Sequence, residues 1–284
     1  MRYNGNKTKG RILTDYFFKW LTLAISSICA VPLILILYFI VSKGISAINW
    51  QFFVNIPAPV GEKGGGVLND IIGTVMLVIM ASAIAIPIAV IAGVYLAENK
   101  NSPTANLVRF CAEILQGVPS IVIGVIAYIW VVKPFHHFSA ISGSVALAIM
   151  MLPVIIRTTE ETIKMVPNHI KEGSLALGVP YYKTMLRIII PCGYSGIISG
   201  IIISVARIAG ETAPLLFTSF GNPYISYNPV KPIGSLPQTI FLYAMSPYAD
   251  WIQQAWGASF ILLSCILIIS LVSKFLTRRW KIQF

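Results

Sequence analysis

Long apolar segments dominate this chain of 284 residues and restrict its possible folds more than any other feature. Crossing the hydrocarbon layer of a bilayer takes about 20 apolar residues. Inside lipid, every backbone N–H and C=O must be paired within its own segment, so such runs form helices. The sequence therefore predicts an all-α polytopic membrane protein with a single domain over residues 1–284, whose six transmembrane helices lie at about 17–42, 71–96, 108–132, 140–157, 193–217 and 256–276.

The composition supports a membrane protein and argues against other classes. Charged residues make up 11% of the chain, whereas soluble domains carry about 25%. The net charge of +11 comes from bases that mostly flank apolar runs, so we expect no nucleic-acid partner and assign membrane lipid as the surroundings. No Cys/His cluster and no phosphate-binding G-x-x-x-x-G-K-[ST] loop occurs, so we expect neither a metal site nor ATP hydrolysis on this chain.

The distribution of Lys and Arg predicts the orientation of the helices. Most of the 21 bases lie in the two tails and in the 97–109 and 157–190 connections. Cytoplasmic segments carry this excess, so both termini are expected in the cytoplasm. The first apolar run is longer than a signal-peptide core of roughly 7–15 residues and is expected to remain as an uncleaved span. The stretches 43–70 and 218–255 are then extracytoplasmic caps.

A charged insert interrupts the apolar pattern between the fourth and fifth spans, at about 158–190. Pro167 can open a short helix there, and Gly178 with Pro180 can end it. A second short helix, "YYKTMLRIII", is expected to stop at Pro191. The pattern predicts two cytoplasmic helices joined by a Gly-x-Pro corner, with one face of the first helix formed by Ile170, Ser174 and Leu177.

The spacing of this insert resembles the cytoplasmic motif of ABC importer permeases. That motif reads Glu-Ala-Ala, three residues, Gly, nine residues, Ile-x-Leu-Pro, and Glu172, Gly178, Ile188 and Pro191 occupy the corresponding places. The departures keep small or aliphatic character: Gly173 and Ser174 replace the alanines, and Ile190 replaces leucine. The resemblance implies a coupling helix that docks into a groove of an ATPase subunit. The alternative is an amphipathic helix pair lying on lipid headgroups.

The fifth span contains two charged residues. Small residues recur every four positions at Gly196, Gly200 and Ser204, which is typical of close helix packing. Arg207 and Glu211 follow, and an arginine at the bilayer centre costs about 2.5–3.5 kcal/mol on insertion scales. Such a residue is expected to face a partner, a cavity or a transported ion. Gly210 and Pro214 bracket Glu211, so we expect the helix to bend or open there.

The chemistry of this pair favours a protonated oxyanion. A guanidinium presents a planar fork that matches phosphate oxygens. A carboxylate beside it repels most anions, but phosphate at neutral pH retains a proton that it can donate to Glu211, and sulfate does not. We therefore expect Arg207, Glu211 and the adjacent Thr212 to lie on a substrate pathway. The alternative is a structural ion pair that locks two spans together.

A second break is expected in the third span, within "AEILQGVPS". Gly117 and Pro119 interrupt the helix, and Ser120 can pair the freed backbone groups. Together with Glu113 they are candidate gating residues near the cytoplasmic entry of the span. The alternative for Glu113 is an ion pair with Arg109, one turn earlier.

Four segments extend the resemblance over nearly the whole chain: "IIGTVMLVIM", "LQGVPSIVIG", "ARIAGETAPLLF" and "LYAMSPYADW". Together they look like the PstA-type permease subunits of bacterial phosphate-specific ABC transporters. The resemblance implies a type I ABC importer permease in the bacterial inner membrane. Its partners would be a PstC-like second permease, a PstB-like ATPase dimer that holds ATP and Mg²⁺, and an extracytoplasmic phosphate-binding protein. No cofactor is expected on this chain itself.

The sequence thus predicts a subunit that forms half of a phosphate translocation pathway and is driven by a separate ATPase. One alternative is an ABC permease for another oxyanion, such as phosphonate, sulfate or molybdate. A second is an ion-coupled secondary carrier, which usually shows paired inverted repeats that this chain lacks. A third is a membrane scaffold, in which an intramembrane Arg–Glu pair would have no purpose.

Overall fold

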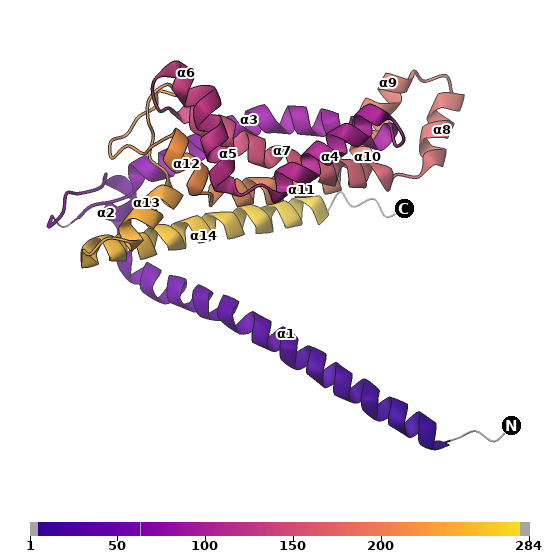
Figure 1. The fold of residues 1–284 in the computed structure, drawn as a ribbon, viewed down its shortest axis with the longest axis horizontal. Helices are drawn as coiled ribbons and strands as arrows, with labels where there is room; N and C mark the ends of the chain where they lie inside the picture. Colours follow the sequence, from indigo (N-terminus) through magenta and orange to yellow (C-terminus); the bar gives the residue numbers. More distant parts are fainter. Residues whose placement is uncertain (1–4, 63, 279–284) are drawn as a thin grey trace.

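A computed structural model of the chain describes residues 5–62 and 64–278, and this part is built from helices (Figure 1). The basic residues Arg2, Lys63, Arg279 and Lys281 lie outside the described residues. The long helices are α1 (Gly5–Ala47), α3 (Leu68–Glu98), α7 (Ala140–Lys164), α11 (Tyr194–Ala209) and α14 (Ala249–Arg278). Shorter ones are α2 (Trp50–Val54), α4 (Pro103–Gly117), α5 (Ser120–Ala127), α6 (Lys133–Phe135), α8 (Asn168–Ala176), α9 (Tyr181–Thr184), α10 (Ile190–Cys192), α12 (Ala213–Thr218) and α13 (Leu236–Ala244).

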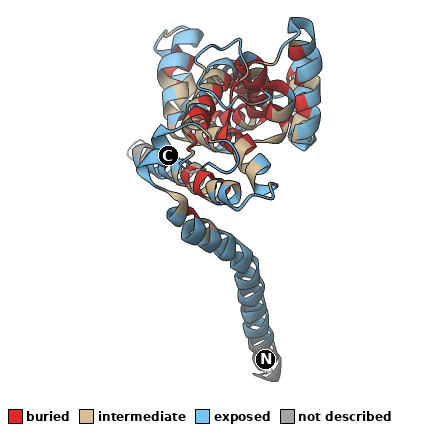
Figure 2. Ribbon diagram, turned by 90° about the vertical axis from the view of Figure 1, so that its left-hand side faces the viewer, coloured by how far each residue is buried: buried red, intermediate tan, exposed pale blue. Residues whose placement is uncertain are grey.

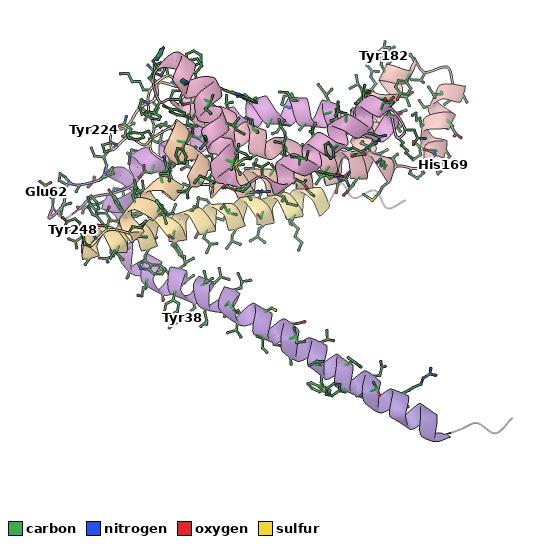
Figure 3. The ribbon with its side chains drawn as sticks, in the orientation of Figure 1. Tyr38, Glu62, His169, Tyr182, Tyr224 and Tyr248 are labelled. Atoms are coloured by element: carbon green, nitrogen blue, oxygen red, sulfur yellow. The ribbon has the colours of Figure 1, made fainter. Side chains whose placement is uncertain are left out.

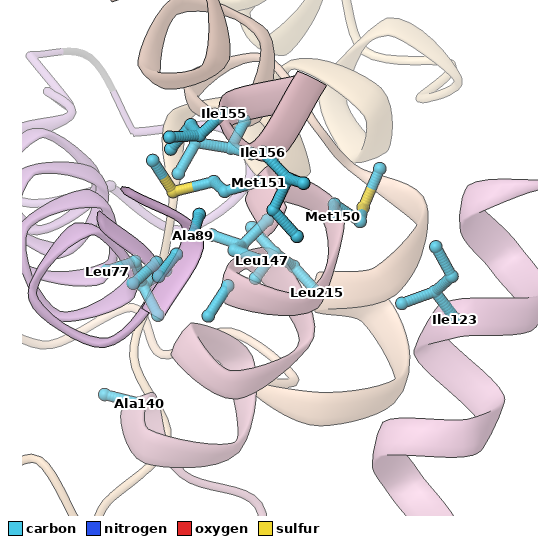
Figure 4. Close-up of a cluster of buried hydrophobic side chains, with 14 of the residues drawn as sticks. Leu77, Ala89, Ile123, Ala140, Leu147, Met150, Met151, Ile155, Ile156 and Leu215 are labelled. Atoms are coloured by element: carbon cyan, nitrogen blue, oxygen red, sulfur yellow. The ribbon is translucent and has the colours of Figure 1, made fainter. Parts of the chain in front are cut away.

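Helix α7 is the centre of the bundle. Of its most apolar stretch 67% is buried, against 22% for α3 and none for α1. Figure 4 shows the resulting core, in which Leu77 and Ala89 of α3 lie beside Leu147 and Met151 of α7. Ile123 of α5 and Leu215 of α12 belong to the same buried cluster. Every element that carries a candidate site residue in the apolar segments therefore packs against one central helix or its immediate neighbours.

The expected small-residue stripe forms the contact between α7 and α11. A Cβ atom at Gly196 would lie 2.4 Å from Thr162 Oγ1, and one at Gly200 would lie 2.0 Å from Thr158 Oγ1. Ser204 continues the seam, donating a 3.4 Å hydrogen bond to the backbone oxygen of Met151. The two helices run antiparallel, and only glycine allows the approach at these levels. Close packing of this kind holds helices together where lipid removes the hydrophobic driving force.

Helix α1 stands apart from the bundle over most of its length (Figures 1 and 2). It joins α14 near its C-terminal end, where a Cβ atom at Gly44 would lie 2.5 Å from Phe260 Cβ. The Lys43 ammonium lies 5.4 Å from the centre of the Trp256 ring. The rest of α1 exposes apolar side chains such as Trp20 and Phe39, as expected of a helix surrounded by lipid or another membrane subunit.

Four helices in the described part of the chain are long and apolar enough to cross a membrane, or up to six if each of two bent pairs counts as one span. The bent pairs are 103–117 with 120–135, bent by 109°, and 181–192 with 194–209, bent by 68°. The segment expected at 140–157 belongs to a helix that continues to Lys164. The charged residues 157–164 thus extend α7 and do not begin the insert.

The described residues contain two π-helical turns, at Tyr128–Val132 and Met185–Ile189, and each ends two residues before a proline. In the second, the N–H of Ile190 bonds the oxygen of Met185, five residues earlier. A proline provides no N–H and clashes with the preceding turn, and a widened turn accommodates it. For this reason Pro191 does not stop its helix as expected, and the helix continues through it to Cys192.

We expect Gly200→Leu to separate α7 from α11 and to destabilise the protein. Overpacking costs about 1–3 kcal/mol because neighbouring side chains must leave their preferred positions. Thermal unfolding in detergent measures the change. Gly173→Ala is the matched control, because a Cβ at Gly173 meets no atom within 4 Å. Equal stability of both variants would contradict the packing role assigned to Gly200.

Candidate functional site

Arg207 and Glu211 meet at the break between α11 and α12. Helix α11 ends at Ala209, where the N–H of Gly210 bonds the oxygen of Arg207. Glu211 therefore lies in the turn, not on a continuous helix, and Arg207 Nε is 3.7 Å from Glu211 Oε1. The Arg207 side chain is 47% exposed and that of Glu211 20% exposed. Within the described residues this is the only ion pair that Arg207 makes, so most of its guanidinium donors are free to bind an anion.

Thr212 connects the same break to α13. Its hydroxyl donates a 3.4 Å hydrogen bond to the backbone oxygen of Pro237. Gly210 and Thr212 also border an apolar cavity of about 500 Å³, which α1, α13 and α14 complete with Ile40, Phe241 and Leu263 among others. The lining of this cavity is unsuited to an anion. Thr212 thus has a structural bond in addition to its expected place beside the substrate pathway.

The break in the third apolar segment lies where the sequence indicates it, between Gly117 and Ser120. The break follows a helix of 15 residues, α4. It therefore lies further from the connection at 99–102 than the predicted position near the cytoplasmic entry of the span. Helix α5 then crosses α12 closely, since a Cβ at Gly124 would lie 2.7 Å from Pro214 Cα. The two helix breaks therefore face the same region of the bundle. Ser120 forms no side-chain hydrogen bond within the described part of the chain, contrary to its expected role.

A second group of charges gathers around Glu160 of α7, which is completely buried. Arg109 Nε lies 2.7 Å and Lys164 Nζ 2.5 Å from Glu160 Oε1. Arg157 Nη1 lies 3.5 Å from the other carboxylate oxygen. Glu113, which was considered as a partner of Arg109, is instead 3.5 Å from Arg157. Arg109 does not pair with Glu113, because its guanidinium also donates hydrogen bonds to the backbone oxygens of Lys100 and Leu96.

Helices α8 and α9 form a corner, here taken as residues 167–191, at one end of the molecule. Figure 3 shows His169 and Tyr182 at this end, and Glu62, Tyr224 and Tyr248 at the other. Inside the corner the hydroxyls of Ser174 and Thr184 lie 2.9 Å apart, and both residues are buried. Gly178 turns the chain with a φ of +76°, a conformation that favours glycine.

The outer surface of the corner consists of residues from the expected motif and from the turn. Glu172, Gly173 and Gly178 are exposed, as is Pro191, whereas Ile188 is half-buried. Of the residues predicted to share one face of this helix, Ser174 is buried whereas Leu177 is 85% exposed. Leu177 follows the last residue of α8, Ala176, and its N–H still bonds the oxygen of Gly173.

The opposite end of the bundle contains a buried polar network that no sequence pattern indicates. Asp70, in the first turn of α3, accepts a 2.6 Å hydrogen bond from Thr239 and a 3.1 Å bond from Asn69. Asn69 also donates to the backbone oxygen of Asn222. These contacts attach the 219–239 segment to α3. Burial, and secondarily the Asp70 carboxylate, raise the pKa of Tyr243 in α13 to about 12, so its hydroxyl keeps its proton.

Two groups of polar residues were not predicted from the sequence: the charges around Glu160 and the network around Asp70. The sequence indicates the first group more clearly than the second. Arg157, Glu160, Glu161 and Lys164 are spaced by three and four residues, the pattern of a charged helix face. Asp70 precedes an apolar run as one acidic residue among several polar ones, and only the fold reveals its burial. Among the described residues, no group of three or more His, Cys, Asp or Glu could hold a metal ion.

Comparison with known proteins gives concordant results. The profile of the family described as binding-protein-dependent transport system inner membrane component matches residues 85–282. The chain is 40% identical to the phosphate transport system permease protein PstA of Yersinia pestis, over 88% of this chain and 85% of the relative. It is 36% identical to the protein of the same name from Haemophilus influenzae, over 96% and 95%.

The fold is similar to that of a chain in the inward-facing MetNI methionine ABC transporter. The TM-score is 0.61 at 16% sequence identity, and the match covers 75% of this chain and 97% of the other. At this identity the likeness concerns the fold alone. It agrees with an all-helical ABC importer permease architecture.

We expect Glu160→Ala to destabilise the protein strongly. Removing Glu160 leaves three cations without their shared carboxylate. Because their side chains are 16–40% exposed, the cost is expected to be below the roughly 3–5 kcal/mol of a fully buried pair. Thermal unfolding in detergent measures the loss. Glu161→Gln is the control, because Glu161 is exposed and makes only a 3.6 Å contact with Arg157. A Glu160→Ala protein as stable as the control would show that the cluster contributes little to the fold.

Proposed function

The chain belongs to the family of binding-protein-dependent transport system inner membrane components, and on this basis we propose that it passes inorganic phosphate through the membrane. Members of this family are permease subunits of ABC transporters, so the chain is an integral membrane protein and a transport component. Its relatives from Yersinia pestis and Haemophilus influenzae are named phosphate transport permeases. The substrate of this chain is inferred from these names together with the chemistry of its own site.

The observation that carries the proposal is the incomplete pairing of Arg207. Its 3.7 Å contact with Glu211 is too long for a hydrogen bond, and about half of the side chain is exposed. Arg207 lies 13 residues into α11, about 20 Å from the start of that helix, so it lies far along an apolar segment. A guanidinium in such a place gains most from a transient anion that fits its fork.

Glu211 gives this site its selectivity for a protonated anion. Its carboxylate lies close enough to orient the guanidinium, and it can accept a hydrogen bond from the proton that a phosphate bound to Arg207 retains. A fully ionised oxyanion such as sulfate has no proton to donate and is repelled. Thr212 stabilises the turn that contains Glu211, because its hydroxyl donates a hydrogen bond to the backbone oxygen of Pro237. The break at Gly117–Ser120 faces the same region and is proposed, with Glu113, to change the opening of the pathway.

The corner of α8 and α9 is proposed to receive the movement of an ATPase subunit. It lies at one end of the bundle, and Leu177 and Glu172 extend from it into solvent. The membrane orientation proposed from the basic residues places this end and both termini in the cytoplasm. An ATPase partner and further subunits follow from the family. We assign them as a PstB-like dimer that holds ATP and Mg²⁺, a PstC-like permease and an extracytoplasmic phosphate-binding protein, in a bacterial inner membrane.

We expect Arg207→Ala to abolish phosphate uptake by the reconstituted complex while assembly is retained. A hydrogen bond to a charged group contributes about 1.5–3 kcal/mol. Arg207→Lys, which keeps the charge but loses the fork, should therefore reduce uptake by roughly tenfold to a hundredfold. Radiolabelled phosphate uptake into proteoliposomes measures both effects.

Lys133→Ala serves as the control for that experiment, since Lys133 is an exposed cation in a different helix. Sulfate uptake is measured in parallel. Wild-type phosphate uptake by the Arg207→Ala complex would exclude the proposed anion site. Uptake of sulfate in preference to phosphate by the unmodified complex would instead support the alternative of another oxyanion.

We expect Gly178→Val to impair ATPase docking and transport-linked hydrolysis. The positive φ of Gly178 disfavours any β-branched residue, and no atom lies near enough to make the effect one of crowding. Gly178→Asn is the matched variant, because asparagine tolerates this conformation better. Co-purification of the ATPase and phosphate-stimulated hydrolysis are measured. Normal values for the valine variant would disprove the coupling role of the corner.

A further inference from the structure

The last residue of α3, Glu98, contacts both arms of the corner at once. Its Oε2 atom accepts a hydrogen bond from the Lys171 ammonium of α8 and another from the Tyr181 hydroxyl, at the start of α9. The Lys171 ammonium also lies 5.0 Å from the centre of the Tyr181 ring. One carboxylate oxygen of α3 therefore contacts α8 and α9 at residues that follow it by 73 and 83 positions in the sequence.

This contact is more than a solvated surface pair. The Glu98 side chain is 17% exposed and that of Lys171 28% exposed. Beneath it, Ala97 of α3 belongs to a buried apolar cluster with Ile163, Met185 and Ile189. An ion pair that is partly removed from water and receives two donors is less screened than an exposed one. Among the described residues Glu98 pairs with Lys171 and not with nearby Lys100.

Helix α3 connects this junction to the rest of the bundle. It packs along α7, where a Cβ at Gly93 would lie 2.6 Å from Thr159 Cβ. The adjacent Thr158 of α7 meets Gly200 of α11, the helix that carries Arg207. Tightly packed helices move as units, because an interior at this density does not deform continuously. A displacement of the corner that is passed to α3 would therefore also displace α7 and α11.

We propose that Glu98 is a positioning residue that transmits movement of the α8–α9 corner to α3, through its shared contact with Lys171 and Tyr181. The inference rests on the proposed function of the corner as the receiver of the ATPase movement. It adds a polar route from corner to bundle, beside the covalent connections at either end of the corner and the apolar packing of Met185 and Ile189. Loss of this route uncouples hydrolysis from transport without removing the ATPase docking surface.

The test is Glu98→Gln in the complete complex, reconstituted with ATPase subunits and binding protein. The neutral amide keeps the shape of the side chain and removes the charge that holds Lys171. We expect ATPase co-purification and ATP hydrolysis to persist, while phosphate transported per ATP hydrolysed falls by about fivefold or more, the usual lower range of coupling between sites. Tyr181→Phe, which removes one of the two donors, should lower the ratio less.

Two further variants sharpen the result. The double variant Glu98→Lys with Lys171→Glu exchanges the two charges and should restore part of the ratio of phosphate transported to ATP hydrolysed. A general loss of structure would not be rescued by this exchange. Lys133→Gln removes an exposed cation in a different helix, and should leave the ratio unchanged. An unchanged ratio in Glu98→Gln, or a parallel loss of hydrolysis and uptake, overturns the proposal. Failure of the unmodified complex to transport phosphate would overturn the proposed function instead.

Discussion

Charges that enter an apolar bundle must be balanced inside it, because lipid cannot solvate them. Two charged groups of this protein, around Glu160 and around Arg207, are balanced in different ways. Glu160 is completely buried and is surrounded by Arg109, Arg157 and Lys164. Arg207, by contrast, has one carboxylate neighbour at 3.7 Å. The first arrangement satisfies its charge permanently and suits a structural role. The second leaves donors available, and this difference supports Arg207 as the place where an anion binds.

The contacts of α7 determine how these two groups are related. Three threonines of α7 meet glycines of its neighbours: Thr158 meets Gly200 and Thr162 meets Gly196 of α11, and Thr159 meets Gly93 of α3. The adjacent Glu160 pairs with Arg109 of α4 and, one turn further along α7, with Lys164. One helix thus fixes the distance between the charged cluster, the small-residue seam and the break that holds Arg207. A change at either end of α7 is transmitted through packed side chains to the other elements.

Helix breaks interrupt this rigid arrangement in two places within the described residues. The turns at 117–120 and 209–213 lie close together because α5 crosses α12 at Gly124 and Pro214. Irregular backbone at such depth is tolerated where it faces protein or a cavity. The π-turns before Pro134 and Pro191 show a different solution, in which the helix continues through a proline by widening one turn.

The sequence by itself determined the helical class, the approximate positions of the apolar segments, the Gly-x-Pro corner and both helix breaks. Each of these follows from local chemistry: apolar length, glycine spacing and the missing N–H of proline. The tertiary structure alone decided which charges meet. Arg109 pairs with Glu160 and not with Glu113, because α7 continues to Lys164 and brings Glu160 under α4. The contact of Glu98 with Lys171 and Tyr181, and the burial of Asp70, likewise depend on segments distant in sequence. Local sequence patterns do not indicate which distant segments pack together, so these contacts are visible only in the folded structure.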